Sequence, residues 1–247
     1  MSRKMVWEVV PVKKWMRQRL LLIGLLMSSI VLLWTVETHI SHIPAMGDAQ
    51  QQMHVLVLDA GHGGIDGGAV AEDGTVEQDI NLHIVTTSRD LAGFLGIPVV
   101  LTRADQQSLD YNPEKTIRQN KVADIHAREQ LVKQQNNPVF VSVHLNKFSD
   151  ASYSGAQTFW SKNNAEGQRL AESIQQALTD GLHPERVRTA KAAENSIYLM
   201  KQLTCPAVIV ECGFLSNAED VAKLKESAYH TKLAVCIIGG YQNQYGA

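Results

Sequence analysis

A short apolar run that ends in a glycine-rich turn constrains this chain more than any other feature. Residues 55–59, Val-Leu-Val-Leu-Asp, predict a buried strand, and the turn at 61–68 contains five glycines and His62. Two later β-branched runs, at 139–143 and 206–210, end at His144 and Glu211. Parallel strands place their carboxyl ends along one edge of a sheet, where open α/β sheets bind ligands. We therefore expect His62, His144 and Glu211 to share one cleft.

Strands and helices are expected to alternate from residue 54 to the end of the 247-residue chain. The expected strands are 55–59, 98–103, 138–144, 156–160, 197–200 and 207–211, and the expected helices are about 76–95, 115–135, 164–180, 217–226 and 229–243. This alternation predicts an α/β fold, a three-layer α/β/α arrangement around a mostly parallel, twisted sheet of about six strands. Residues 54–247 are enough for one catalytic domain with a full core.

The N-terminus has the charge pattern of an export segment. Residues 1–19 contain six Lys or Arg against Glu8 alone, and residues 20–36 contain no charge. Seventeen uncharged residues are just long enough to span a bilayer, and the basic flank keeps the N-terminus cytoplasmic. We expect a signal anchor at 20–36 and a polar stalk at 37–53, so that residues 54–247 lie outside the membrane. A cleaved signal peptide is the alternative, although only the stretch at 44–47 approaches a cleavage site.

Charge and cysteine content narrow the function classes. Beyond residue 19 the chain has 17 basic and 24 acidic residues, a net charge of −7, which argues against nucleic acid as a partner. Three cysteines allow at most one disulfide, and Cys205 and Cys212 bracket a strand, too far apart to pair. We expect all three cysteines to be small buried hydrophobes.

A zinc site is the chemistry that the strand-end residues fit best. Hydrolytic zinc takes about three protein ligands, and two histidines with one carboxylate are a known set. His62 and His144 would supply the nitrogens, and Glu77 is the best carboxylate because it begins the helix that leaves the glycine turn. Asp79 would point to another face of that helix. A dinucleotide site is excluded because Asp66 occupies the third glycine position of that fingerprint.

Glu211 is the candidate proton carrier. A half-buried carboxylate beside a metal can take a proton from an attacking water and pass it to a leaving amine. The other interpretation of Glu211 is a loop cap or a salt bridge. Arg128 could pair with a carboxylate inside the site or on the surface, and Asn81 and Asn146 could bind substrate or serve only the fold.

From residue 54 to 241 the chain resembles the zinc-dependent N-acetylmuramoyl-L-alanine amidases of the amidase 3 family. The resemblance rests on four motifs: Leu-Asp-Ala-Gly-His-Gly-Gly-Ile-Asp-Gly-Gly-Ala at 58–69, Glu-Gln-Asp-Ile-Asn-Leu at 77–82, Ser-Val-His-Leu-Asn at 142–146, and Pro-Ala-Val-Ile-Val-Glu-Cys-Gly-Phe-Leu-Ser-Asn at 206–217. It implies one Zn²⁺ held by His62, Glu77 and His144, with Glu211 as the catalytic residue. The implied reaction is hydrolysis of the amide between N-acetylmuramic acid and L-alanine in peptidoglycan.

An export segment followed by one bare catalytic domain most resembles the germination-specific amidases of spore formers. That resemblance implies an enzyme that faces the cell wall or spore cortex and removes stem peptides for muramic δ-lactam formation. It leaves open the preferred stem peptide and whether a partner protein activates the enzyme. Two other functions remain: a non-catalytic peptidoglycan-binding module and a zinc peptidase that acts on stem peptides.

Overall fold

The computed structural model describes residues 19, 26–29 and 53–246. The chain divides into two units, Met1–Gln52 and Met53–Ala247. The predicted basic segment 1–19, hydrophobic segment 20–36 and stalk 37–53 lie almost entirely outside the described residues, although residues 26–29 are helical. Within the described part of the chain, no helix is both long and apolar enough to span a bilayer.

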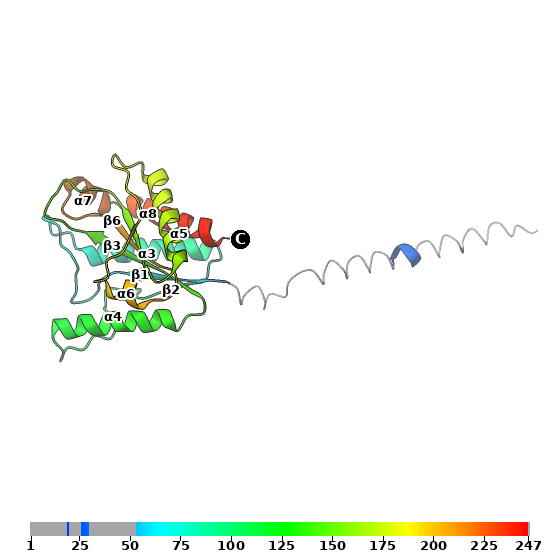
Figure 1. Ribbon diagram of the computed structural model, residues 1–247, viewed down its shortest axis with the longest axis horizontal. Coiled ribbons are helices and arrows are strands. Elements are labelled where there is room, and N and C mark those ends of the chain that lie inside the picture. The colour runs from blue at the N-terminus through cyan, green and yellow to red at the C-terminus, as the bar shows by residue number, and fades with distance from the viewer. Residues whose placement is uncertain (1–18, 20–25, 30–52, 247) are drawn as a thin grey trace, which may run out of the picture. The chain divides into compact units, whose positions relative to one another are not determined.

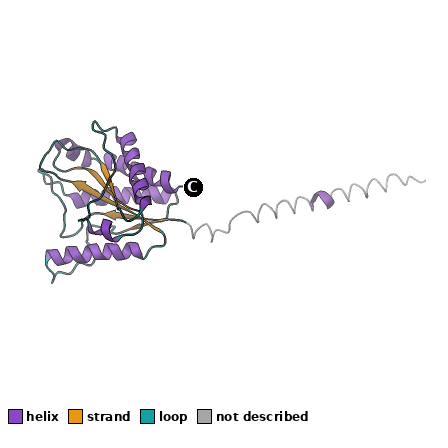
Figure 2. Cartoon of the chain, in the orientation of Figure 1, coloured by secondary structure: helices purple, strands orange, loops and turns teal. Residues whose placement is uncertain are grey.

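The second unit is built around a six-stranded sheet, seen between helices in Figures 1 and 2. The strands are β1 (Val55–Ala60), β2 (Val99–Leu101), β3 (Pro138–Asn146), β4 (Gln157–Trp160), β5 (Lys191–Ala192) and β6 (Ala207–Phe214), in the order β2-β1-β3-β6-β4-β5. The first four strands of that order are parallel, and β4 pairs with β6 in the antiparallel sense. The predicted three-layer α/β fold with a mostly parallel sheet is confirmed.

Helices cover both faces of the sheet. The helices α3 (Glu77–Phe94), α5 (Ala165–Leu182) and α8 (Ser227–Tyr245) pack together on one face, and α7 (Ala218–Leu224) joins β6 to α8. The helices α4 (Ile117–Lys133) and α6 (Tyr198–Gln202) lie on the other face, with α4 along the lower edge in Figure 1. Two apolar clusters follow from this layering. The larger contains Leu56 and Ile174, and the smaller contains Phe140 and Met200.

Local sequence explains where several helices begin. Thr116 and Gln119 form a reciprocal capping box at the start of α4, and Asn164 caps α5 with its side chain. The side chain of Asn217 accepts the backbone N–H of Asp220 at the start of α7. Each cap satisfies an N–H group that has no partner within its helix.

The strand predicted at 197–200 is wrong. Residues 198–202 form the helix α6. The sheet instead gains the two-residue strand β5, which the sequence did not predict. A short apolar run does not distinguish a buried strand from a buried helix by periodicity. Burial of Leu199 and Met200 in the smaller apolar cluster, beside α4, decided the helix.

The three cysteines are free thiols, in agreement with the expectation that Cys205 and Cys212 cannot pair. Cys212 and Cys236 are buried, whereas Cys205 is only partly buried, so the expectation of burial is wrong for Cys205. Burial raises the pKa of Cys205 to about 11 and also raises the pKa values of Cys212 and Cys236. None of the three thiols is therefore an activated nucleophile at neutral pH.

Candidate metal centre

The candidate site lies where β1, β3 and β6 end, next to the first turn of α3. His144 is the register partner of Glu211 on β3 and β6, and Ala60, two residues before His62, pairs with Val143 on β3. Glu77 opens α3 immediately after the glycine turn. The expected convergence of the three strand ends is what the register shows.

His62, Glu77 and His144 form a compact cluster of ligand-type atoms. Nε2 of His62 lies 3.3 Å from Oε1 of Glu77, and Nδ1 of His144 lies 3.1 Å from the same oxygen. One atom from each residue lies within 4.8 Å of the other two. Ligand atoms of a tetrahedral zinc with bonds of 2.0–2.1 Å stand roughly 3.3 Å apart. The three side chains therefore fit a zinc ion.

Glycines allow the three side chains to come this close. The ring of His144 lies against Gly61, and a Cβ atom at that position would overlap the ring. Gly68 has φ +73°, and a Cβ atom there would crowd both Glu77 and His62. The glycine-rich turn is thus required by packing around the cluster.

The backbone also holds the carboxylate of Glu77 in place. The Oε2 atom accepts the N–H of Ala69 at 2.8 Å, and Oε1 accepts the N–H of Leu145 at 3.0 Å. The side-chain amide of Asn81 donates to the carbonyl of Gly61 at 3.2 Å and lies 3.4 Å from Oε1. Asn81, for which sequence left a substrate role and a structural role open, therefore ties α3 to the glycine turn.

Asp66 contacts one of the candidate ligands, an interaction that the sequence interpretation missed. Its Oδ2 atom lies 3.0 Å from Nδ1 of His62, and its Oδ1 atom lies 2.7 Å from Nζ of Lys121. A carboxylate on the far nitrogen of a metal-binding histidine fixes the tautomer and the orientation of the ring. The sequence carries a signal for this contact, because Asp66 lies four residues after His62 within the same glycine turn.

Electrostatics favour positive charge at the cluster. Burial alone would lower the pKa of His62, but the carboxylates of Asp66 and Glu77 outweigh it and raise the pKa to about 9. Burial would raise the pKa of Glu77, yet His144 and His62 hold it well below its ordinary value. The site stabilises a proton on His62 and the ionised form of Glu77. The same charges would stabilise a metal cation bound between these two residues.

Glu211 faces the cluster without joining it. Burial raises its pKa to about 7, although the nearby His144 opposes the shift. Its Oε2 atom is buried and has no hydrogen-bond partner in the described structure. A carboxylate with one buried oxygen that has no partner, and with a pKa near neutrality, is suited to proton transfer.

A buried polar network lies beneath the site. Arg128 pairs with Asp59 and, at 2.7 Å, with Asp124. The carboxylate of Asp59 also accepts from the hydroxyls of Thr102 and Ser142. Arg128 therefore pairs with carboxylates inside the protein, and the alternative of a surface salt bridge is wrong.

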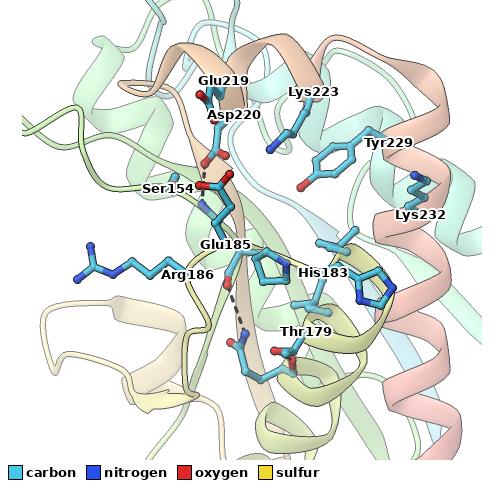
Figure 3. A pocket seen from close by; sticks show the side chains of 16 residues that line it. Ser154, Thr179, His183, Glu185, Arg186, Glu219, Asp220, Lys223, Tyr229 and Lys232 are labelled. Carbon is cyan, nitrogen blue, oxygen red and sulfur yellow. Dashed lines mark hydrogen bonds between the residues drawn. The ribbon is translucent and has the colours of Figure 1, made fainter.

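One surface cavity of the described chain lies away from the cluster. A cavity of about 400 Å³ at the junction of α5, α7 and α8 is lined by Lys223, Tyr229 and Lys232, among others (Figure 3). The four candidate site residues do not line it. Its wall residue Asp220 accepts the N–H groups of Gly155 and Phe214, at 2.8 and 2.9 Å. Asp220 therefore supports the end of β6 and contributes no chemistry at the cluster.

Two hollows are lined by residues that lie close in the sequence to the candidate site residues. One, of about 600 Å³, is lined by residues 64–65 of the glycine turn, by Gln78 beside Glu77, and by Tyr111. The other, of about 270 Å³, is lined by residues 71–73 and by Leu215 after β6. Neither hollow is lined by His62, Glu77, His144 or Glu211 themselves.

Comparison with known proteins identifies the family of this chain. The family model described as N-acetylmuramoyl-L-alanine amidase matches residues 56–243. The germination-specific N-acetylmuramoyl-L-alanine amidase of Bacillus subtilis is 31% identical over 233 residues, which cover 91% of this chain and 94% of the relative.

Two solved structures extend the comparison. The CwlD amidase from Clostridioides difficile, solved in complex with the GerS lipoprotein, is 40% identical with a TM-score of 0.74, over 77% of this chain and 98% of that one. The catalytic domain of CwlV from Bacillus (Paenibacillus) polymyxa is 25% identical with a TM-score of 0.66, over 77% of this chain and 97% of that one. With these matches across the whole folded unit, the chain belongs to the N-acetylmuramoyl-L-alanine amidase family.

Proposed function

We propose that this protein cleaves the amide between N-acetylmuramic acid and L-alanine in peptidoglycan, with one zinc ion held by His62, Glu77 and His144. The observation that carries the proposal is the cluster of three ligand atoms within 4.8 Å, facing a partnerless carboxylate oxygen of Glu211. Membership of the amidase family supports the choice of bond.

The residues of the site have different roles in the proposed reaction. A zinc ion at this position supplies a Lewis acid that polarises the amide carbonyl and lowers the pKa of water. Glu211 accepts the proton of the attacking water and then delivers it to the nitrogen of the leaving L-alanine. Asp66 keeps Nε2 of His62 directed at the cluster by holding Nδ1.

The biological role that we propose is in the spore cortex. Removal of the stem peptide leaves a muramic residue that a second enzyme can convert to muramic δ-lactam, which serves germination. Similarity to the germination-specific amidase of Bacillus subtilis supports this role. The complex of CwlD with a lipoprotein supports a lipoprotein partner for this chain.

We further propose that residues 20–36 anchor the protein in the membrane and that residues 54–247 form the catalytic domain on the side of the wall. The charge pattern of residues 1–36 supports this arrangement. An amidase that acts on the wall or cortex must also reach a substrate outside the membrane.

Digestion of purified peptidoglycan tests the reaction. New L-alanine amines together with stem-free muramic acid are expected. New termini within the stem would indicate a peptidase, and no release would indicate a binding module.

Metal analysis tests the site: the wild-type protein should hold one zinc, and His62→Ala and His144→Ala should lose it. Retention of tightly bound zinc and full activity in both variants would show that the ligands are assigned wrongly.

A further inference from the structure

Three consecutive backbone carbonyls, those of Ala60, Gly61 and His62, accept hydrogen bonds from buried arginines. Arg128 donates through Nη1 to Ala60 at 2.8 Å and through Nη2 to His62 at 2.6 Å. Arg103 donates through Nε to Ala60 at 2.9 Å and through Nη2 to Gly61 at 3.1 Å. Two guanidinium groups thus bind every carbonyl of the segment that leads from β1 to the proposed metal ligand.

This segment needs support beyond the local bonds of its own turn, which are the Gly63–Asp66 bridge and the contact of Asp66 with His62. His62 has φ +62°, in the left-handed region that a side chain disfavours by about 1–2 kcal/mol. The glycines on both sides, Gly61 and Gly63, are free to adopt many other conformations. Without contacts from elsewhere, the backbone of His62 would leave this conformation readily, and its ring would leave the cluster with it.

The two arginines are themselves rigidly held. Arg128 and Arg103 are 3% and 4% exposed. Arg128 is fixed by Asp59 and Asp124, and these carboxylates raise its pKa although burial opposes the shift. Arg103 also donates to the carbonyl of Gln78, the residue after Glu77, at 2.8 Å. The guanidinium groups therefore connect both ligand-bearing segments to the body of the protein.

We propose that Arg128 and Arg103 are positioning residues that hold His62 in its metal-binding conformation. This inference rests on the proposed zinc site and adds the means by which one of its ligands is preorganised. A planar guanidinium can bind two neighbouring carbonyls at once with a fixed geometry, whereas a lysine ammonium is a single point on a flexible stem. Substitution of either arginine by lysine keeps the charge and removes the fork.

The contacts predict a difference between the two arginines. The carbonyl of His62 accepts from Arg128, whereas that of Gly61 accepts from both Arg103 and Asn81. The carbonyl of Ala60 keeps one donor when either arginine is replaced. Arg128→Lys should therefore affect His62 more than Arg103→Lys does.

The experiment measures zinc affinity by competition with a chelator in the purified full-length protein and its variants. Glu129→Ala is the matched control, because Glu129 is the buried neighbour of Arg128 on α4 but binds Lys133 and Tyr198. Circular dichroism verifies that each metal-free variant is folded. Visible spectra of the Co²⁺-loaded proteins report the ligand geometry independently of activity.

Arg128→Lys should raise the dissociation constant of zinc by about 10–100-fold and change the Co²⁺ spectrum. Arg103→Lys should give a smaller change of the same kind, and Glu129→Ala should match the wild type in both measurements. Wild-type zinc affinity in both lysine variants would overturn the inference, as would an equal loss in Glu129→Ala. If Arg128→Lys does not fold, Arg103→Lys still decides. A wild-type protein that binds no zinc would refute the proposed metal site itself, which is a separate result.

Discussion

His144 and Glu211 are register partners on the neighbouring parallel strands β3 and β6. Directly paired residues present their side chains on the same face of a sheet, so a proposed ligand and a proposed proton carrier stand side by side. The roles differ because their surroundings differ. His144 lies 3.1 Å from the carboxylate of Glu77, whereas Oε2 of Glu211 is buried without a partner.

Glu211→Gln should separate catalysis from metal binding. The amide has nearly the same volume but cannot carry the proton, so peptidoglycan cleavage should fall by roughly 10²–10⁴-fold while zinc content stays at the wild-type level. Amine release from purified peptidoglycan and metal analysis of the same sample are the measurements. A folded, zinc-loaded variant with the wild-type rate would eliminate the mechanism, and loss of zinc would make Glu211 a ligand.

Glu77→Gln should give the opposite pattern. Loss of the carboxylate weakens zinc retention, and excess zinc should restore part of the activity. Asp79→Asn is the control, since Asp79 lies in the same first turn of α3 but outside the cluster. Titration of activity with zinc checks the prediction. If Glu77→Gln and Glu211→Gln behave alike, the roles of the two glutamates are assigned incorrectly.

Asp66→Asn should weaken zinc binding without removing a ligand. The asparagine no longer fixes Nδ1 of His62 as a charged acceptor, so the dissociation constant of zinc should rise about 10–100-fold. Asp73→Asn, which changes an exposed carboxylate paired with Lys225, should have no such effect. Equal zinc affinity in the two variants, measured by chelator competition, would contradict an orienting role for Asp66.

The metal-free protein should lose stability near neutral pH because of Glu211. Its pKa rises from 4.5 to about 7 in the folded state, so the folded protein binds this proton more tightly than the unfolded chain does. The contribution is present below pH 4.5 and is lost as the pH rises through about 7. The free energy of unfolding of Glu211→Gln, relative to the wild type, should therefore increase by roughly 3 kcal/mol between pH 4.5 and 7.5.

Urea unfolding of the metal-free proteins at several pH values measures this difference. Glu114→Gln changes the net charge by the same amount at an exposed position and should show no comparable trend. If the difference in unfolding free energy between Glu211→Gln and the wild type does not change with pH, the pKa of Glu211 is not raised in the folded protein.

The proposed topology predicts that residues 54–247 lie outside the membrane. Protease added to intact protoplasts should digest this part of the protein, because the basic residues before residue 20 keep the N-terminus inside. A cytoplasmic protein in the same protoplasts controls for leakage. Protection of the domain in intact protoplasts, together with digestion after lysis, would refute export.

The local sequence pattern was enough to predict three central strands and the candidate site residues. The apolar runs that end at His62, His144 and Glu211 predicted strands β1, β3 and β6, because a buried parallel strand requires a β-branched run whatever its neighbours are. The start of a helix after the glycine turn predicted the place of Glu77. The motifs around these four residues predicted the family, which comparison confirms.

Only the tertiary structure decided which groups support the site. Arg103 and Arg128 donate to the carbonyls of Gly61 and His62, which lie 42 and 66 residues away from them in the chain. Sequence spacing carries no information about such contacts. The same holds for residues 198–202, which form α6 because Leu199 and Met200 pack into the apolar cluster beside α4. Periodicity shows which residues are buried, but the packing of distant segments determines what they are buried against.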